Sequence, residues 1–140
     1  YGPLMKLDDG RIHSDLVGDV IKKKNLLIKG NHNVIRSFCY ITVVVLGIIL
    51  VILKGKNGES YNIANPNETL KVIQLAKIIS KISNKNITFK KNKNLKRNNF
   101  KYPKISVDKI KKLGWRPSTN LSEGIKRTLN FFKKDKKKFK

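Results

Sequence analysis

The chain has 140 residues, the size of one domain or part of one, and 39% of them are hydrophobic, which excludes a wholly disordered chain. A single cysteine, Cys39, excludes an internal disulfide and a cysteine-based metal site. The formal net charge of +23 is carried mainly by lysine. Because specific phosphate or base recognition favours arginine, we do not expect a nucleic-acid partner.

The first part of the chain predicts a helix, two short strands and a second helix. Apolar residues recur at helical spacing between residues 10 and 24. Residues 26–28 indicate a strand that ends at Gly30, and residues 36–40 indicate another. Residues 41–53 are apolar apart from one threonine and one glycine, which predicts a helix buried against a sheet.

The apolar run at residues 38–53 also resembles a membrane anchor. A spanning helix requires about 20 such residues, with about 17 as a practical minimum, and this run falls short of that length. It also contains Gly47. We therefore predict a buried helix rather than a membrane span.

The middle of the chain predicts a strand, a helix and a basic loop. Residues 60–63 indicate the strand, and Thr69 is placed to cap the helix. Residues 85–104 are basic and rich in asparagine, with a short strand candidate at 87–89. The predicted buried face of the helix consists of Val72, Leu75, Ala76 and Ile79.

Two helices are predicted before the basic tail at residues 133–140. Ser106 is placed to cap a short helix, which ends at Gly114. The other helix begins near Asn120, with Glu123 completing a pair that resembles a capping box. Its predicted buried face consists of Leu121, Ile125, Leu129 and Phe132.

No motif in the sequence identifies a reaction centre. It has neither a glycine-rich phosphate-binding loop after a strand nor a Gly-Lys-Ser/Thr loop. His13 and His32 are far apart, and no acidic or cysteine cluster offers metal-ligand spacing. The pair Asp8 and Asp9 precedes Gly10, which predicts a turn and a helix start rather than catalytic carboxylates. We assign no catalytic and no metal-binding residue.

Several segments, taken in order, nevertheless carry a resemblance to a known family. These segments are residues 1–12, 26–30, 36–41, 58–66 and 112–128. Their residues and spacing resemble the extended short-chain dehydrogenase/reductases of the NAD-dependent epimerase/dehydratase family. Within that family they look most similar to UDP-glucuronate decarboxylases and nucleotide-sugar 4,6-dehydratases. The resemblance covers nearly all of the chain except the basic loop and the tail.

The resemblance implies an α/β fold of helices with a few short strands, in which residues 1–132 are the carboxy-terminal substrate-binding region of a Rossmann-type enzyme. The half that binds NAD and holds the catalytic Tyr-x-x-x-Lys pair would lie before Tyr1. Residues 60–63 would complete its sheet. The chain alone would then be an inactive fragment of a cytoplasmic lyase or epimerase. A UDP- or dTDP-sugar would be the substrate, and the intact enzyme would be a homodimer.

The resemblance also implies substrate-binding residues. In the family, certain positions line the diphosphate, lie beside the base or pair with phosphate. The residues of this chain that match those positions are Ser14, Asp15, Leu16, Ile28, Lys29, Arg36 and Lys101. Arg36 matches the arginine that pairs with phosphate in the family. A planar guanidinium can bind two phosphate oxygens at once, in a bidentate manner. Lys101 stands where relatives have a second arginine and keeps only its charge. Val43 replaces an aspartate of the relatives, which removes a helix cap worth about 1 kcal/mol.

Three possible reactions stay open, namely decarboxylation, dehydration and epimerisation. Two further hypotheses do not involve an enzyme. The chain could be a basic protein that binds nucleic acid through residues 85–104, in which case binding would depend steeply on salt. It could also be a small membrane protein anchored by residues 38–53.

Overall fold

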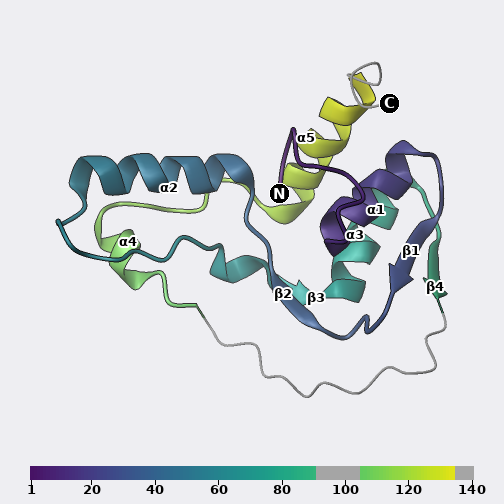
Figure 1. Ribbon diagram of the computed structural model, residues 1–140, viewed down its shortest axis with the longest axis horizontal. Helices are drawn as coiled ribbons and strands as arrows, with labels where there is room; N and C mark the ends of the chain where they lie inside the picture. Colours follow the sequence, from purple (N-terminus) through teal and green to yellow (C-terminus); the bar gives the residue numbers. More distant parts are fainter. Residues whose placement is uncertain (91–104, 135–140) are drawn as a thin grey trace.

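The computed structural model describes residues 1–90 and 105–134 (Figure 1). Its helices are α1 (Ile12–Ile21), α2 (Ile41–Lys54), the 3₁₀ helix η1 (Pro66–Glu68), α3 (Val72–Ser83), α4 (Asp108–Lys112) and α5 (Leu121–Lys134). Its strands are β1 (Leu26–Lys29), β2 (Ile35–Ser37), β3 (Thr69–Lys71) and β4 (Ile87–Lys90). This mixture, in which helices predominate, confirms the predicted α/β class.

The strands form two small sheets. β1 and β4 are parallel, with Leu26 opposite Ile87 and Lys29 opposite Lys90. β2 and β3 are antiparallel, with Ser37 opposite Thr69. A parallel pair requires a crossover connection, and here the chain passes through α2 and α3 between β1 and β4 (Figure 1).

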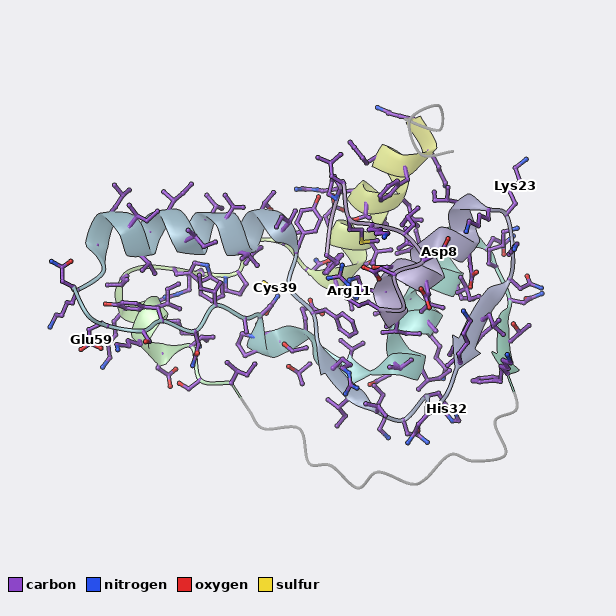
Figure 2. The ribbon with its side chains drawn as sticks, in the orientation of Figure 1. Asp8, Arg11, Lys23, His32, Cys39 and Glu59 are labelled. Atoms are coloured by element: carbon purple, nitrogen blue, oxygen red, sulfur yellow. The ribbon has the colours of Figure 1, made fainter. Side chains whose placement is uncertain are left out.

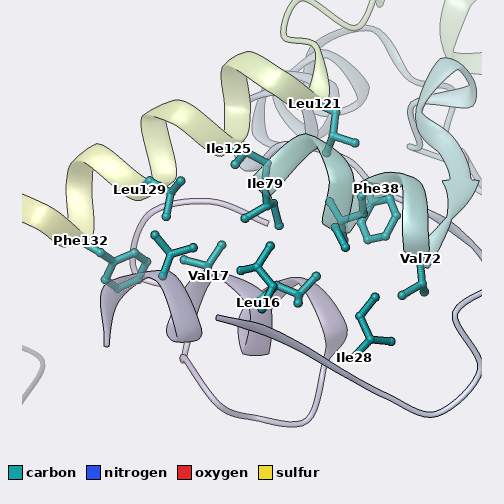
Figure 3. Close-up of a cluster of buried hydrophobic side chains, with 14 residues drawn as sticks. Leu16, Val17, Ile28, Phe38, Val72, Ile79, Leu121, Ile125, Leu129 and Phe132 are labelled. Carbon is teal, nitrogen blue, oxygen red and sulfur yellow. The ribbon is translucent and has the colours of Figure 1, made fainter. Parts of the chain in front are cut away.

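The main hydrophobic cluster lies where α1, α3 and α5 meet β1 (Figure 3). Each helix contributes one apolar face, as its 3.6-residue periodicity predicted. The faces predicted for α3 and α5 are both buried. The members of the cluster are Leu16, Val17, Val20, Leu26, Ile28, Phe38, Val72, Leu75, Ala76, Ile79, Leu121, Ile125, Leu129 and Phe132.

A second, smaller cluster lies between α2 and α4, away from the main one (Figure 1). The Nε1 atom of the buried Trp115 donates a hydrogen bond to the carbonyl of Val43, at 3.1 Å. Gly47 provides room for the same indole, because a Cβ atom at that position would lie 2.9 Å from Trp115 Nε1. The buried members of the second cluster are Tyr40, Val43, Ala64, Val107, Ile110 and Trp115.

The prediction that the helix at 41–53 is buried against a sheet is wrong. Within α2 only Val43 and Gly47 are buried, and most of its other apolar side chains are exposed. The helix is apolar around its whole circumference, so periodicity could not identify which side faces the protein. Among the described helices, none has the length and hydropathy of a membrane span.

Three predicted local features also differ from the structure. Residues 60–63 are not a strand, because no strand among the described residues lies beside them. The strand predicted at 36–40 ends at Ser37, where its partner β3 begins at Thr69. Thr69 therefore pairs in a sheet and does not cap α3. Lys71 takes that place, and its N–H donates to Gln74 Oε1 at 2.8 Å.

Other predicted features are confirmed. Asn120 Oδ1 accepts a hydrogen bond from the N–H of Glu123 at 2.9 Å, as a cap of α5 should. The cap predicted for α4 differs, because the N-cap is Val107 and makes no side-chain cap hydrogen bond, whereas Ser106 lies one residue earlier and its Oγ accepts from the N–H of Asp108 at 3.3 Å. Gly114 follows α4 with φ of 98°, a conformation that suits glycine. The basic residues 91–104, with Lys101, and the tail residues 135–140 lie outside the described ranges.

Candidate functional site

A cavity of about 520 Å³ lies beside the start of α1, the end of β1 and strand β2. Its volume is within the range of sites that bind small molecules. Its polar lining comes from Arg11, His13, Lys29, Asn31, Arg36 and Ser37. No aspartate or glutamate of the described residues lines it. The described lining is therefore basic, although two of its cations have carboxylate partners that lie outside the lining.

The three cations differ in how far they are already paired. Arg11 donates through Nε to Asp9 Oδ2 at 2.7 Å and also through Nη2, so its charge is largely compensated. This guanidinium holds the pKa of the Asp9 carboxyl well below its usual range. Lys29 Nζ lies 3.9 Å from Asp15 Oδ2, a long ion pair in which the lysine side chain is exposed.

Arg36 is the cation with the least compensation. Its Nη1 atom donates to the carbonyl of Ile35 at 2.9 Å, and the described residues offer it no carboxylate. The side chain projects from an exposed position on β2. Its remaining N–H groups can therefore bind an anion that enters the cavity.

An aromatic group forms the other part of the lining. The ring of His13 lies edge-on to Tyr1 and Phe38, with centroid separations of 6.4 and 6.2 Å. Burial lowers the pKa of His13 to about 4, and the nearby amino-terminal charge and Arg11 act in the same direction. His13 is thus a neutral donor and acceptor at neutral pH and adds no charge to the site.

Of the predicted binding residues that the structure describes, two line the cavity, Lys29 and Arg36. Asp15 lies next to it, since its side chain approaches Lys29 and accepts from the N–H of Gly10 at 3.2 Å. The buried residues Ser14, Leu16 and Ile28 do not line it, and the latter two belong to the main hydrophobic cluster. Their predicted roles, and that of Lys101, stay predictions.

Sequence reasoning did not assign Arg11, His13 or Asn31 to the site. One signal was present for Arg11, because arginine is rare in a chain whose basic residues are mainly lysine. His13 and Asn31 carry no such signal, since they come together only when α1 packs beside β1 and β2. No group of three His, Cys, Asp or Glu residues in the described ranges could hold a metal ion.

The fold and cavity can be compared with those of solved structures. A dTDP-glucose 4,6-dehydratase from Bacillus anthracis, in complex with NAD, matches 99% of this chain and 43% of its own, with a TM-score of 0.79 and 20% identity. The UDP-glucose 4-epimerase of Thermotoga maritima, in complex with UDP-glucose, matches 96% of this chain and 43% of its own, with a TM-score of 0.79 and 26% identity. The chain thus has the fold of one part of the NAD-dependent epimerase/dehydratases.

Sequence comparison leads to particular relatives. UDP-glucuronic acid decarboxylase 3 of Arabidopsis thaliana is 32% identical over 126 residues, which are 89% of this chain and 36% of that protein. Human dTDP-D-glucose 4,6-dehydratase is 35% identical over 107 residues, 71% of this chain and 30% of that protein. No protein-family model matches the chain.

The chain is therefore homologous to UDP-glucuronic acid decarboxylases and to a dTDP-glucose 4,6-dehydratase, which confirms the resemblance seen in its sequence. It spans about a third of the length of these relatives.

Proposed function

We propose that residues 1–132 are the nucleotide-sugar-binding part of an NAD-dependent sugar-nucleotide decarboxylase, dehydratase or epimerase. The observation that carries this proposal is the cavity in which Lys29 and the uncompensated Arg36 come together without a carboxylate in the described lining. The relatives support it, because their names state activities on UDP- and dTDP-linked sugars. Decarboxylation, a lyase reaction, would agree with the Arabidopsis relatives.

The chemistry of this chain would consist of binding and orienting the substrate. Arg36 and Lys29 would hold the diphosphate, because charge-assisted hydrogen bonds to phosphate oxygens are among the strongest available. Arg11, kept in place by Asp9, and the amide of Asn31 would complete the polar wall. NAD, bound by the part of the enzyme that this chain does not span, would supply hydride transfer at the sugar. The intact enzyme would work in the cytoplasm as a homodimer.

Replacement of Arg36 provides the direct test. We expect the chain to bind UDP-glucuronic acid, UDP-glucose or dTDP-glucose in calorimetric titration. Arg36→Ala should weaken the binding by about 10-fold or more, since a hydrogen bond to a charged group is worth about 1.5–3 kcal/mol. Arg36→Lys should give an intermediate affinity, because it keeps the charge but loses the planar fork.

Arg127→Ala is the matched control. Arg127 lies on α5, where its Nε donates to Glu123 Oε1 at 2.8 Å, and it does not line the cavity. This variant removes the same charge from the protein and should leave the affinity unchanged. Equal affinities for the wild-type chain and Arg36→Ala would contradict the proposed function.

A further inference from the structure

The imidazole of His13 is a polar group of the cavity whose hydrogen-bonding capacity is unused. Its ring lies edge-on to the rings of Tyr1 and Phe38, and all three residues line the cavity. The residue is half-buried, and within the described residues neither ring nitrogen of His13 makes a hydrogen bond. A polar group among apolar rings is costly to leave without a partner, so a ligand that provides one gains affinity there.

The charge of the imidazole determines which chemistry it can recognise. Burial lowers the pKa of His13 to about 4, so the ring is neutral at neutral pH. A neutral imidazole carries one N–H donor and one nitrogen acceptor, and a hydroxyl group also donates and accepts, whereas an ionised phosphate only accepts. His13 therefore matches a hydroxyl better than an anion, and Arg36 in the same cavity matches the anion.

Strand β2 sets the distance between these two kinds of group. Arg36 and Phe38 are two residues apart, and both line the cavity. The N–H of Phe38 continues the pairing of β2, because it donates to the carbonyl of Glu68 at 3.0 Å. Two residues of a strand span roughly 7 Å, and the ring of Phe38 is in edge contact with His13. A sugar ring joined to a phosphate at Arg36 therefore has the length to reach the imidazole.

We propose that His13 determines specificity by forming a hydrogen bond with a hydroxyl group of a sugar that is joined to the diphosphate. This inference rests on the proposed function, because Arg36 and Lys29 must hold the diphosphate for a sugar to lie beside His13. Two sugars carry such hydroxyl groups, namely the ribose of the nucleotide and the hexose at its far end. A site that forms a hydrogen bond with a hydroxyl discriminates against ligands that lack it.

Replacement of His13 by phenylalanine tests the proposal with three ligands. His13→Phe retains an aromatic ring beside Tyr1 and Phe38 but removes both ring nitrogens. Pyrophosphate, UDP and UDP-glucose are titrated calorimetrically into the wild-type chain and the variant. We expect the affinity for UDP-glucose to fall about 3- to 10-fold, which is the effect of losing a neutral hydrogen bond. The affinity for pyrophosphate should stay nearly unchanged, because this ligand has no hydroxyl-bearing sugar.

UDP distinguishes the two possible sources of the hydroxyl. It carries the ribose but not the hexose. A loss of affinity that UDP shares with UDP-glucose would assign the hydroxyl to the ribose. A loss confined to UDP-glucose would assign it to the hexose.

His32→Phe is the matched control, because it makes the same substitution outside the cavity. His32 does not line the cavity, and its ring lies edge-on to Phe89 at a centroid separation of 5.2 Å. In Figure 2, His32 lies in the turn that follows β1, apart from Arg11 at the start of α1. The affinities for all three ligands should be the same in this variant as in the wild-type chain.

A measurement on the wild-type chain does not depend on the folding of any variant. In the chain labelled with nitrogen-15, UDP-glucose should shift the ring-nitrogen resonances of His13, and pyrophosphate should shift them far less. The resonances of His32 should not respond to either ligand. This comparison separates a ligand contact of His13 from a role in folding.

Several results would overturn the proposal. They are equal affinities of the wild-type chain and His13→Phe for UDP-glucose, an equal loss of affinity for pyrophosphate, and ring-nitrogen resonances of His13 that UDP-glucose does not shift. If His13→Phe binds like the wild-type chain while Arg36→Ala binds more weakly, the specificity role is wrong and the proposed function stands. If no nucleotide-sugar binds, the proposed function fails, and the inference about His13 fails with it.

Discussion

His13 shows how the surroundings of one side chain determine what it can contribute to the cavity. Its ring lies among Tyr1, Phe38 and the paired Arg11, and burial is the main reason why its pKa is lowered to about 4. The imidazole therefore adds no positive charge to the site at neutral pH. Binding of a nucleotide-sugar should not require protonation of this imidazole.

The lowered pKa of His13 predicts a dependence of stability on pH. An unfolded chain would protonate this histidine near its ordinary value of 6.5, whereas the folded chain does so only near 4. Protons then bind preferentially to the unfolded state, so the stabilising contribution is complete above pH 6.5 and is lost as the pH falls towards 4. Urea unfolding at several pH values should show this decrease between 6.5 and 4.

His13→Gln is the control for this effect, because glutamine does not titrate. Its free energy of unfolding should change less with pH over the same interval. A variant whose pH dependence matched that of the wild-type chain would show that other groups are responsible.

Among the elements, α2 depends on the absence of a side chain at Gly47. In Gly47→Ala the new methyl group would approach both Trp115 Nε1 and Ile63, the latter at 3.0 Å from its Cγ2. Overpacking typically destabilises by about 1–3 kcal/mol, which outweighs the gain of about 1 kcal/mol from helix propensity. We expect a net loss of about 1 kcal/mol in urea unfolding, followed by the fluorescence of Trp115, the only tryptophan.

Thr42→Ala separates the effect of overpacking from the effect of helix propensity, because Thr42 is exposed on the same helix. That substitution improves helix propensity without a new contact and should leave the chain equally or slightly more stable. If Gly47→Ala were as stable as Thr42→Ala, the inference that α2 packs closely on Trp115 would be wrong.

The elements also show what sequence reasoning can and cannot establish. The buried faces of α3 and α5 were predictable, because apolar residues such as Leu129 recur there with the period of a helix. The exposure of α2 was not predictable, because its residues are apolar in every direction. Residues 60–63 have the composition of a strand, but a strand also needs a neighbour, and pairing is a tertiary property.

The site was predictable only in part, for a related reason. Lys29 and Arg36 were identified through the family resemblance, and both line the cavity. Arg11 and His13 belong to it because of how α1 approaches β2, which no local pattern encodes. Leu16 and Ile28 were assigned to substrate binding; their side chains are buried in the main cluster, and their binding role stays a prediction.

At the scale of the whole molecule, the two hydrophobic clusters differ greatly in size. The main cluster joins three helices and a strand, whereas the cluster beneath α2 contains six buried residues. Local stability follows the amount of buried apolar contact. We expect hydrogen–deuterium exchange to label the amides of α2 faster than those of α3 and α5. Equal protection of the three helices would contradict this difference between the clusters.

The composition of the main cluster has a consequence for synthesis on the ribosome. Leu16 and Leu26 are translated roughly a hundred residues before Ile125, Leu129 and Phe132, which belong to the same cluster. The partner of β1 is also distant, because Leu26 pairs with Ile87. Contacts so far apart in sequence cannot form until the intervening chain has been made. The nascent chain therefore carries the apolar helix α2 before its core can close, a period in which chaperones would find an accessible apolar segment.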